Sequence, residues 1–192
     1  MKLLRCRFDV SLPGGGAIRI RPVGPWARRH LLEGLARTSA ETQTRRFGAP
    51  RAGFSAAELD FLTRIDGRTR MALGALDMGT GRGAGVARWV REGADMAEAA
   101  ILVVDEFARR GVGKWLFGGL IVAAKRAGLK RLRGESHVDN HAMLALARSF
   151  GASDRYAGGG RTELSIDLPG AWPDDSAGRF LACIERHLEA RA

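Results

Sequence analysis

The sequence predicts an α/β fold, and three observations lead to it. An apolar strand, AEAAILVVD, is followed two residues later by the turn ARRGVGK, and a long apolar helix follows that turn. Segments that alternate with a period of two residues are interleaved with segments of helical period. Gly-rich turns such as MGTGRG and GGGR separate alternating segments, which is typical of antiparallel hairpins. With 192 residues, the chain is long enough to bury the core of one domain.

Local signals justify the elements in chain order. Pro25 is a favoured first residue of a helix, Ser39 begins a second short helix, and Ser55 with Glu58 makes a capping-box pattern. Gly128 ends the long helix that follows the ARRGVGK turn. The predicted strands are 17–23, 70–76, 84–90, 97–104, 129–135, 154–156 and 162–168, and the predicted helices begin at Pro25 and Ser39 and span 56–64, 113–127, 140–150 and 177–190.

The chain divides into a main domain and two appendages. The domain spans 17–168, and residues 1–16 form an N-terminal extension whose alternation suggests an added edge strand. Residues 169–192 comprise the linker PGAWPDD and an amphipathic helix with Phe180, Leu181, Ile184 and Leu188 on one face. That face predicts a helix packed on its own domain. A homodimer contact or a flap over the substrate entrance is the alternative.

The turn after the central strand predicts a phosphate site. A Gly-x-Gly turn that opens a helix points main-chain N–H groups outward, and the helix N-terminus adds partial positive charge. Arg109, Arg110 and Lys114 lie within the same six residues as Gly111 and Gly113. Between residues 105 and 133 there are eight Lys/Arg against two acidic residues, so much of the net charge of +10 lies around this turn. We interpret the segment as a pyrophosphate site.

Two common nucleotide motifs do not fit this segment. A Walker A loop needs a Ser or Thr after its lysine, but Trp115 follows Lys114. A dinucleotide-binding fingerprint needs a third glycine where Leu116 stands, and an acidic residue where Lys130 and Arg131 stand. The turn therefore serves a different phosphate ligand.

The segment resembles the coenzyme A site of the GNAT superfamily of N-acetyltransferases. Members carry a strand, a Gln/Arg-x-x-Gly-x-Gly/Ala turn, a helix, a strand, then an Asn that opens a second helix ending before Gly-Phe. Here the turn is Ala108 to Gly113, the Asn is Asn140, and the final pair is Gly151-Ala152. Three residues depart from the pattern. Ala108 replaces the usual Gln or Arg, Ala152 replaces the Phe, and Ala147 stands where many members carry the Tyr that protonates the leaving thiolate.

The blocks IRIRPV, SAETQTRRF, LTRIDGRTRMALGAL and GVARWVREGADMAEAAILVVD further resemble successive segments of bacterial Pat-type protein-lysine acetyltransferases. The likeness runs from about Ile18 to Leu168. It implies a GNAT fold, with a mixed, mostly antiparallel sheet that splays at the acyl-CoA site and carries helices on both faces. It also implies acetyl-CoA as acyl donor without a metal ion. The implied cofactor-binding residues are Leu102, Val103, Val104, Arg109, Arg110, Gly111, Val112, Gly113, Lys114 and Asn140.

The same resemblance implies that Glu98 is the general base, because GNAT lysine acetyltransferases carry a Glu near the head of this strand. Strand alternation places Glu98 with Ala100, Leu102 and Val104 on one face. A salt bridge to Arg88 or Arg91 on the preceding strand would be a purely structural explanation. Glu135 and His137, at the end of the next strand, are the other candidates for the base.

The acceptor implied by the Pat-type likeness is a protein lysine. A small amine such as a polyamine, amino acid or antibiotic is the alternative, and an acidic pocket built from Glu41, Glu58, Asp60 and Asp66 would favour it. A non-catalytic acyl-CoA-binding module is a third hypothesis, because of Ala108 and Ala147.

Composition excludes several other classes. The chain is basic, but it has no helix-turn-helix, RNP or zinc pattern and only 7% aromatic residues, which argues against nucleic acid as partner. Cys6 and Cys183 have no metal-ligand spacing, so no metal site is expected. The sequence has no run of 18 apolar residues, so no membrane span is predicted. Arginines interrupt the N-terminal segment MKLLRCRFDVSL, which therefore is not expected to be a signal peptide. We therefore expect a cytoplasmic protein.

Overall fold

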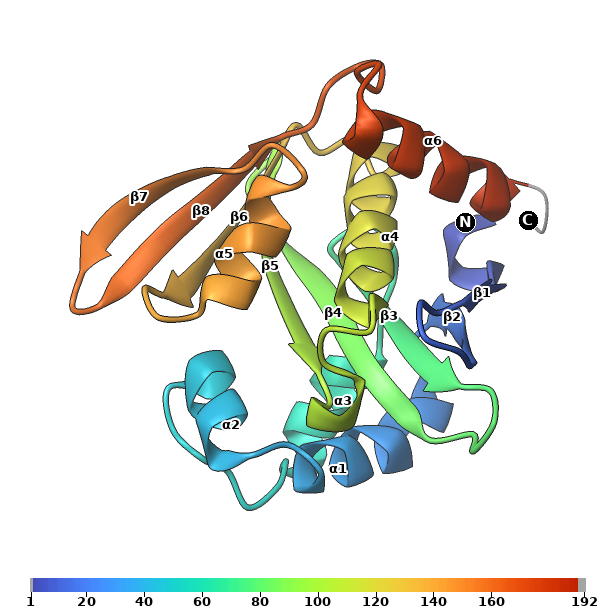
Figure 1. Ribbon diagram of the computed structural model, residues 1–192, viewed down its shortest axis with the longest axis vertical. Helices are drawn as coiled ribbons and strands as arrows, with labels where there is room; N and C mark the ends of the chain where they lie inside the picture. Colours follow the sequence, from blue (N-terminus) through green and yellow to red (C-terminus); the bar gives the residue numbers. More distant parts are fainter. Residues whose placement is uncertain (1, 190–192) are drawn as a thin grey trace.

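The computed structural model describes residues 2–189, which form one eight-stranded sheet with helices on both faces (Figure 1). Three short 3-10 helices are labelled η. In chain order the elements are η1 (Lys2–Arg5), β1 (Phe8–Ser11), β2 (Ala17–Pro22), η2 (Pro25–Ala27), α1 (Arg28–Ala36), α2 (Ala40–Phe47), α3 (Ala56–Thr63), β3 (Arg70–Asp77), β4 (Gly83–Glu92), β5 (Met96–Val103), η3 (Asp105–Phe107), α4 (Val112–Arg126), β6 (Arg131–His137), α5 (His141–Arg148), β7 (Ser153–Gly158), β8 (Arg161–Asp167) and α6 (Ser176–Glu189).

The strand order is β1-β2-β3-β4-β5-β6-β8-β7, and every neighbouring pair is antiparallel except β5 with β6. The parallel pairing covers only Met96 with Arg131, Ala97 with Leu132 and Glu98 with Arg133. Beyond Glu98 the two strands diverge while β5 stays paired with β4 as far as Val103. The sheet therefore forks in its middle, as the predicted fold requires.

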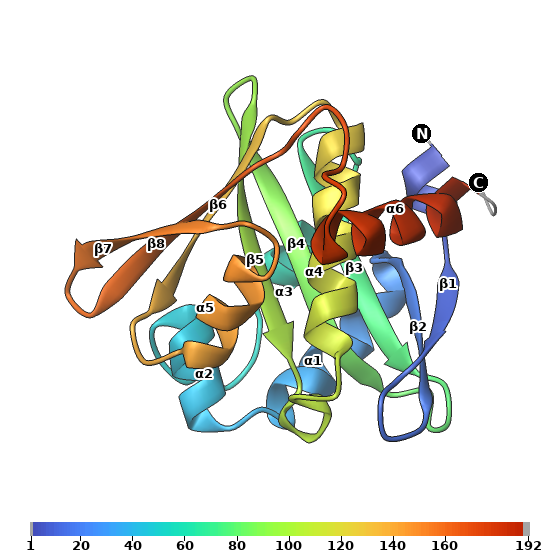
Figure 2. The same cartoon turned by 45° about the horizontal axis from the view of Figure 1, so that its top comes forward.

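Helices α1 to α3 lie on one face of the sheet, and α4 and α5 lie on the other (Figures 1 and 2). Helix α4 is the centre of the core, with Leu116, Leu120 and Ile121 almost fully buried beside the fully buried Trp89 of β4. The strand alternation predicted for β5 is confirmed: Val104 lies against Gly34 of α1, whereas the opposite face of β5 lies against α4.

The N-terminal extension adds strand β1 to the edge of the sheet, where Phe8 pairs with Ile20. The strand is shorter than the alternation of Met1–Leu12 suggested, since Lys2–Arg5 forms a 3-10 helix. Leu12 is nevertheless buried.

The C-terminal helix α6 packs against α4 of its own chain, as Figure 2 shows. Its residues Leu181, Ile184 and Leu188 are buried there. The predicted apolar face is therefore already covered, which removes the sequence-based reason for a homodimer through this helix. Ala190, the predicted last residue of the helix, lies outside the described residues.

The structure corrects the predicted end of one strand and the predicted start of one helix. Strand β6 was predicted to end at Glu135 but continues to His137, because β8 pairs with it as far as Arg161. The helix predicted to run from Pro25 begins as the 3-10 turn η2 before α1. In the described part of the chain, no helix is long and apolar enough to cross a membrane.

Candidate functional site

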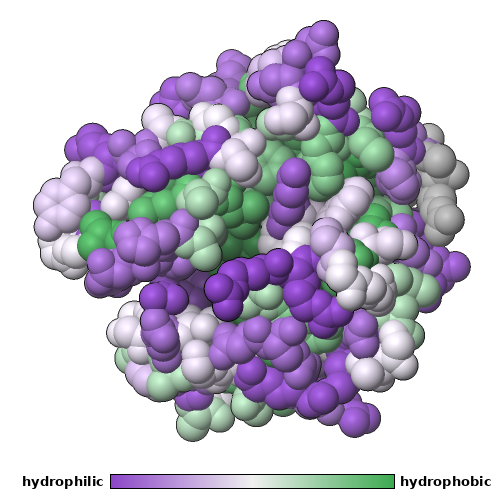
Figure 3. Space-filling model, in the orientation of Figure 1, coloured by the Kyte–Doolittle hydropathy of each residue, from purple (hydrophilic) through white to green (hydrophobic). Residues whose placement is uncertain are grey.

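A cavity of about 770 Å³ lies at the fork between β5 and β6. Its walls come from both sides of the sheet: Arg45 and Arg46 of α2 on one side, and Lys114 of α4 and Met143 of α5 on the other. Figure 3 shows a hollow at this place, between the α5 and β7–β8 region and α2, with hydrophobic residues at its floor and hydrophilic ones around it. We call the α4–α5 wall the turn side and the α2–Glu98 wall the arginine side.

The turn side contains the predicted phosphate site. Helix α4 begins at Val112, and its N-cap Gly111 has φ of 88°, a left-handed conformation that glycine adopts without strain. No side-chain cap bonds to the first N–H groups of this helix. A helix N-terminus with free N–H groups attracts anions. Arg109 also has positive φ (58°), which is uncommon for a residue with a side chain.

Some of the main-chain N–H and C=O groups at the end of β5 already form hydrogen bonds with β4. The N–H of Val104 donates to the carbonyl of Ala84 at 3.0 Å. The carbonyl of Leu102 also points to β4, since a methyl group on Gly85 would lie 2.9 Å from that oxygen. Leu102 and Val104 therefore offer no main-chain groups to the cavity.

The alternate residues of β5 face the fork. The carbonyl of Ala99 points to β6, where a methyl group on Gly134 would come within 2.8 Å of it. Successive strand residues point their main-chain groups in opposite directions, so Ile101 and Val103 also present theirs to the gap. Beyond the last paired residues of the fork, these groups have no partner strand, and an extended ligand can pair with them.

The predicted cofactor residues fall into two groups. Leu102, Val103, Arg109, Gly111, Gly113, Lys114 and Asn140 line the cavity. Three others do not. Val112 is fully buried behind the turn, Val104 is buried and paired with β4, and Arg110 donates to the carbonyl of Gly15 at 3.2 Å.

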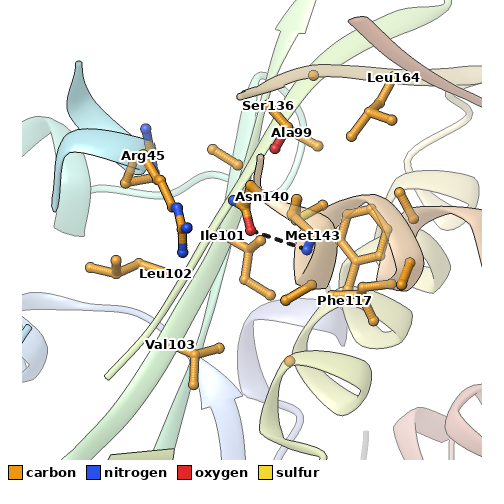
Figure 4. Close-up of a pocket in the computed structure, with 18 of the residues that line it drawn as sticks. Arg45, Ala99, Ile101, Leu102, Val103, Phe117, Ser136, Asn140, Met143 and Leu164 are labelled. Atoms are coloured by element: carbon orange, nitrogen blue, oxygen red, sulfur yellow. Dashed lines mark hydrogen bonds between the residues drawn. The ribbon is translucent and has the colours of Figure 1, made fainter. Parts of the chain in front are cut away.

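Asn140 opens α5, as predicted. Its side-chain oxygen accepts a hydrogen bond from the N–H of Met143 at 3.2 Å. Figure 4 shows Asn140 and Met143 on the side of β5 that carries Ile101, opposite Arg45 and Leu102. The capping bond occupies the carbonyl end of the Asn140 side chain, so its amide N–H groups remain for a ligand.

Among the candidates for the base, Glu98 stands at the last paired position of the fork and lines the cavity. Its carboxylate forms no ion pair within the described residues. The salt bridge to Arg91 considered from the sequence is not formed, because the Arg91 guanidinium donates to the carbonyls of Arg68, Ala94 and Ala127. Arg88 makes no ion pair with Glu98 either, although the two charges interact at longer range.

The two runners-up are less available. Glu135 lines the cavity, but its carboxylate lies 3.5 Å from the guanidinium of Arg161. His137 is exposed, does not line the cavity, and its Nδ1 lies 3.3 Å from the carboxylate of Asp139. Within the described residues, no group of His, Cys, Asp and Glu is arranged to hold a metal ion.

Three residues that line the cavity were not singled out from the sequence. Arg45 and Arg46 of α2 reach it because Asp105 accepts hydrogen bonds from the N–H of Ser39 and the hydroxyl of Thr42, both at 2.7 Å. Ser136 is buried at the cavity wall. The doublet Arg45-Arg46 was visible in the block SAETQTRRF, but only the fold brings it to the fork.

The residues fit an acyl-CoA ligand. The cavity combines a free helix N-terminus with an unpaired strand edge, two features that suit a pyrophosphate and an extended amide-containing arm respectively. A side chain at Gly113 would contact Leu146 and Val103 across the cavity, so glycine keeps this space open. Fold and site together define an acyltransferase of the GNAT type.

Comparison with known proteins gives the family. Residues 38–152 match the acetyltransferase (GNAT) family, and the chain belongs to it. This family uses acetyl-CoA as donor. A curated relative, acetyltransferase Pat of Mycolicibacterium smegmatis, is 36% identical over 147 residues, which cover 76% of this chain and 44% of the relative. The chain thus spans less than half the length of that protein.

Solved structures agree. The GNAT domain of S. lividans PAT superposes with a TM-score of 0.78 at 28% identity and covers 84% of this chain and 97% of that domain. A cAMP-binding acyltransferase from Mycobacterium smegmatis has a TM-score of 0.63 at 27% identity, over 95% of this chain and 54% of the other. The chain is therefore a GNAT acetyltransferase that resembles Pat proteins.

Proposed function

We propose that this protein transfers the acetyl group of acetyl-CoA to the side-chain amine of a protein lysine, with Glu98 as general base. The observation that carries the proposal is the position of Glu98, at the last paired residue of the fork and on the cavity wall, without an ion pair among the described residues. The likeness to Pat acetyltransferase supports lysine as the acceptor.

The chemistry needs a base because a lysine ammonium has a pKa of about 10.4 and is neutral only about once in two thousand molecules at pH 7. Acetyl-CoA, when bound, supplies an acyl group activated as a thioester. Glu98 accepts the ammonium proton, directly or through a water, and so frees the lone pair for attack. The open main chain of Ile101 and Val103 would hold the pantetheine arm, and one N–H group there would polarise the thioester carbonyl.

The proton for the departing thiol comes from water in this scheme. The one tyrosine of the sequence, Tyr156, lies on the outer strand β7 with 65% of its surface exposed and does not line the cavity. Ala147 is buried at the position where other family members carry a tyrosine.

The polyamine alternative loses its main argument. The four acidic residues that would have made an acidic pocket are engaged elsewhere and do not line the cavity. Glu41 pairs with Arg45, Glu58 with Arg51, Asp60 with Arg28, and Asp66 accepts hydrogen bonds from the main chain of the turn that follows it. A polycation would instead meet arginines.

The test separates binding from turnover. Glu98→Gln should bind acetyl-CoA with unchanged affinity in calorimetry, while acetylation of a lysine peptide falls by about 100- to 10,000-fold. Glu135→Gln, which removes another carboxylate that lines the cavity, should keep turnover within a few-fold of the parent. If Glu98→Gln turned over like the parent, the assignment of the base would be wrong.

A further inference from the structure

Three arginines on the elements around Glu98 have no ion pair among the described residues. Arg46 of α2, Arg70 of β3 and Arg88 of β4 are all partly buried, and none has a carboxylate within 4 Å. Four other arginines near the cavity form ion pairs. They are Arg45 with Glu41, Arg51 with Glu58, Arg133 with Glu92 and Arg161 with Glu135. On the turn side, Arg109 and Lys114 line the cavity and also form no ion pair among the described residues. Away from that phosphate site, the unpaired charge lies with Arg46, Arg70 and Arg88.

Two of these arginines lie against one aromatic ring. The guanidinium carbons of Arg70 and Arg88 lie 4.8 and 4.6 Å from the ring centroid of Phe61, a residue of α3 that is 45% exposed. Cations within this distance of a ring are held by it. Arg88 pairs with Ala100, so its side chain leaves the same face of the sheet as Glu98.

Arg46 connects this group to the cavity. It lines the cavity, and its guanidinium carbon lies 5.0 Å from the ring centroid of Phe47. Its charge interacts with those of Arg88 and Glu98. Arg46, Arg70, Arg88 and Phe61 are called the arginine cluster below.

The cluster is costly without an anion. Burial, and after it the charges of Arg46 and Arg70, lower the pKa of Arg88 to about 10 against the opposing effect of Glu98. Burial likewise lowers the pKa of Arg46. Like charges held together in a partly desolvated place destabilise the fold unless a ligand of opposite charge offsets them.

We propose that Arg46 and Arg88, which lie against the rings of Phe47 and Phe61 respectively, bind a carboxylate that the acceptor carries beside its reactive amine. This inference rests on the part of the proposed function in which Glu98 serves acetyl transfer to an amine, and it adds a chemical feature of the acceptor. A guanidinium offers paired N–H donors that match a carboxylate in geometry and charge. The acceptor amine would meet Glu98 while its carboxylate meets the neighbouring arginines.

The carboxylate has two sources. It can be an Asp or Glu side chain within about two residues of the target lysine, since an extended chain rises about 3.3 Å per residue. It can also be the α-carboxylate of a free amino acid. The shared chemistry is an amine with a carboxylate close by, and the experiment distinguishes the two sources.

The experiment compares matched acceptors by steady-state acetylation at saturating acetyl-CoA. The peptide arm uses a short blocked peptide with Asp on both sides of one lysine, together with its Asn counterpart. The amino-acid arm uses lysine and lysinamide, which differ only in the α-carboxylate. The enzymes are the parent, Arg88→Gln, Arg46→Gln, and Arg186→Gln, which removes an exposed positive charge of α6 far from the cavity.

We expect the parent to prefer one carboxylate-bearing acceptor over its neutral partner by about tenfold in kcat/KM, from one charge-assisted hydrogen-bonded contact. Arg88→Gln and Arg46→Gln should each bring the ratio of kcat/KM for the charged acceptor to that for its neutral partner close to one, and Arg186→Gln should retain the ratio of the parent. Unchanged acetyl-CoA affinity in calorimetry checks that each variant is folded. Arg88→Glu should in addition favour an acceptor with lysines in place of the two Asp residues.

The outcomes separate the two proposals. A preference seen only with the peptides assigns the carboxylate to the protein acceptor, and one seen only with lysine over lysinamide assigns it to a free amino acid. Equal use of charged and neutral acceptors in both arms, or a preference that survives in both arginine variants, would overturn the inference alone. Absence of acetylation with every acceptor, despite acetyl-CoA binding, would overturn the proposed function and the inference with it.

Discussion

The two sides of the cavity differ in the groups that line them, which are mainly main-chain groups on one side and charged side chains on the other. The turn side is built mainly from main chain, with a helix N-terminus, a left-handed glycine and an unpaired strand edge. The arginine side carries long charged side chains, with Arg45 and Arg46 of α2 on the cavity wall and Arg88 of β4 near enough for its charge to interact with those of Arg46 and Glu98. Main-chain groups are the same whatever the side chains, so the turn side suits one constant ligand. Side chains can be exchanged one by one, so the arginine side can be adapted to a particular acceptor.

Disabling the turn side alone gives the largest expected effect. Gly111→Glu should weaken acetyl-CoA binding by about 100-fold or more, because it forces a side chain into a φ of 88° and places a negative charge where the helix N-terminus attracts an anion. Calorimetric titration measures this.

Strain must be separated from binding in that experiment. Gly93→Glu is the matched control, since Gly93 also has positive φ (76°) but lies in the turn between β4 and β5 with open space around it. If Gly111→Glu bound acetyl-CoA like the parent, the turn would not be the pyrophosphate site.

A substitution where β5 and β6 part, at the junction between the two sides, has a smaller expected effect. Gly134→Ala would place a methyl group 2.8 Å from the carbonyl oxygen of Ala99, where main chain must move. We expect the free energy of unfolding to fall by about 1–3 kcal/mol, the usual cost of overpacking. Urea denaturation measures it, with Gly170→Ala as control because a methyl group there meets open space. Equal stability of the two variants would mean that the strands part without cost.

The smallest effect concerns the attachment of α2. Burial raises the pKa of Asp105, but hydrogen bonds from Thr42 and Ser39 outweigh burial and hold this pKa below its ordinary value. Asp105→Asn should lower the free energy of unfolding at pH 6 by about 1 kcal/mol. It should also raise the KM for the acceptor, because α2 carries Arg46. The affinity for acetyl-CoA should stay nearly unchanged.

The sign of the pH dependence follows from the lowered pKa. The contribution of the Asp105 carboxylate is fully present above the unfolded pKa of about 3.9 and is lost as the pH falls through the lower folded pKa. The difference between the parent and Asp105→Asn in urea denaturation should therefore shrink as the pH is lowered from 6 to 3. A difference that stays constant over this range would show that the charge on Asp105 is not what fixes α2.

The contrast also explains what the sequence could predict. The turn side is contiguous, so AEAAILVVD and ARRGVGK already indicated strand, turn and helix, and α4 begins at Val112, one residue before the predicted start. Alternation along β5 placed the face of Glu98. The arginine cluster was not predictable, because Arg46, Arg70 and Arg88 come from three segments that meet only after the sheet has paired. The position of Arg110 depended in the same way on a remote contact, its hydrogen bond to Gly15.

The fork also bears on how this chain avoids aggregation. An unpaired strand edge is normally a risk, because strands of other molecules can add to it. The outer strand β7 meets that risk with charged residues such as Asp154 and Arg155. The inner edge at Ile101 and Val103 has no charges, but α2, α4 and α5 stand around it where a second protein strand would have to lie. The protein can thus keep an unpaired strand edge available to its ligand while the surrounding helices exclude strands of other copies from it.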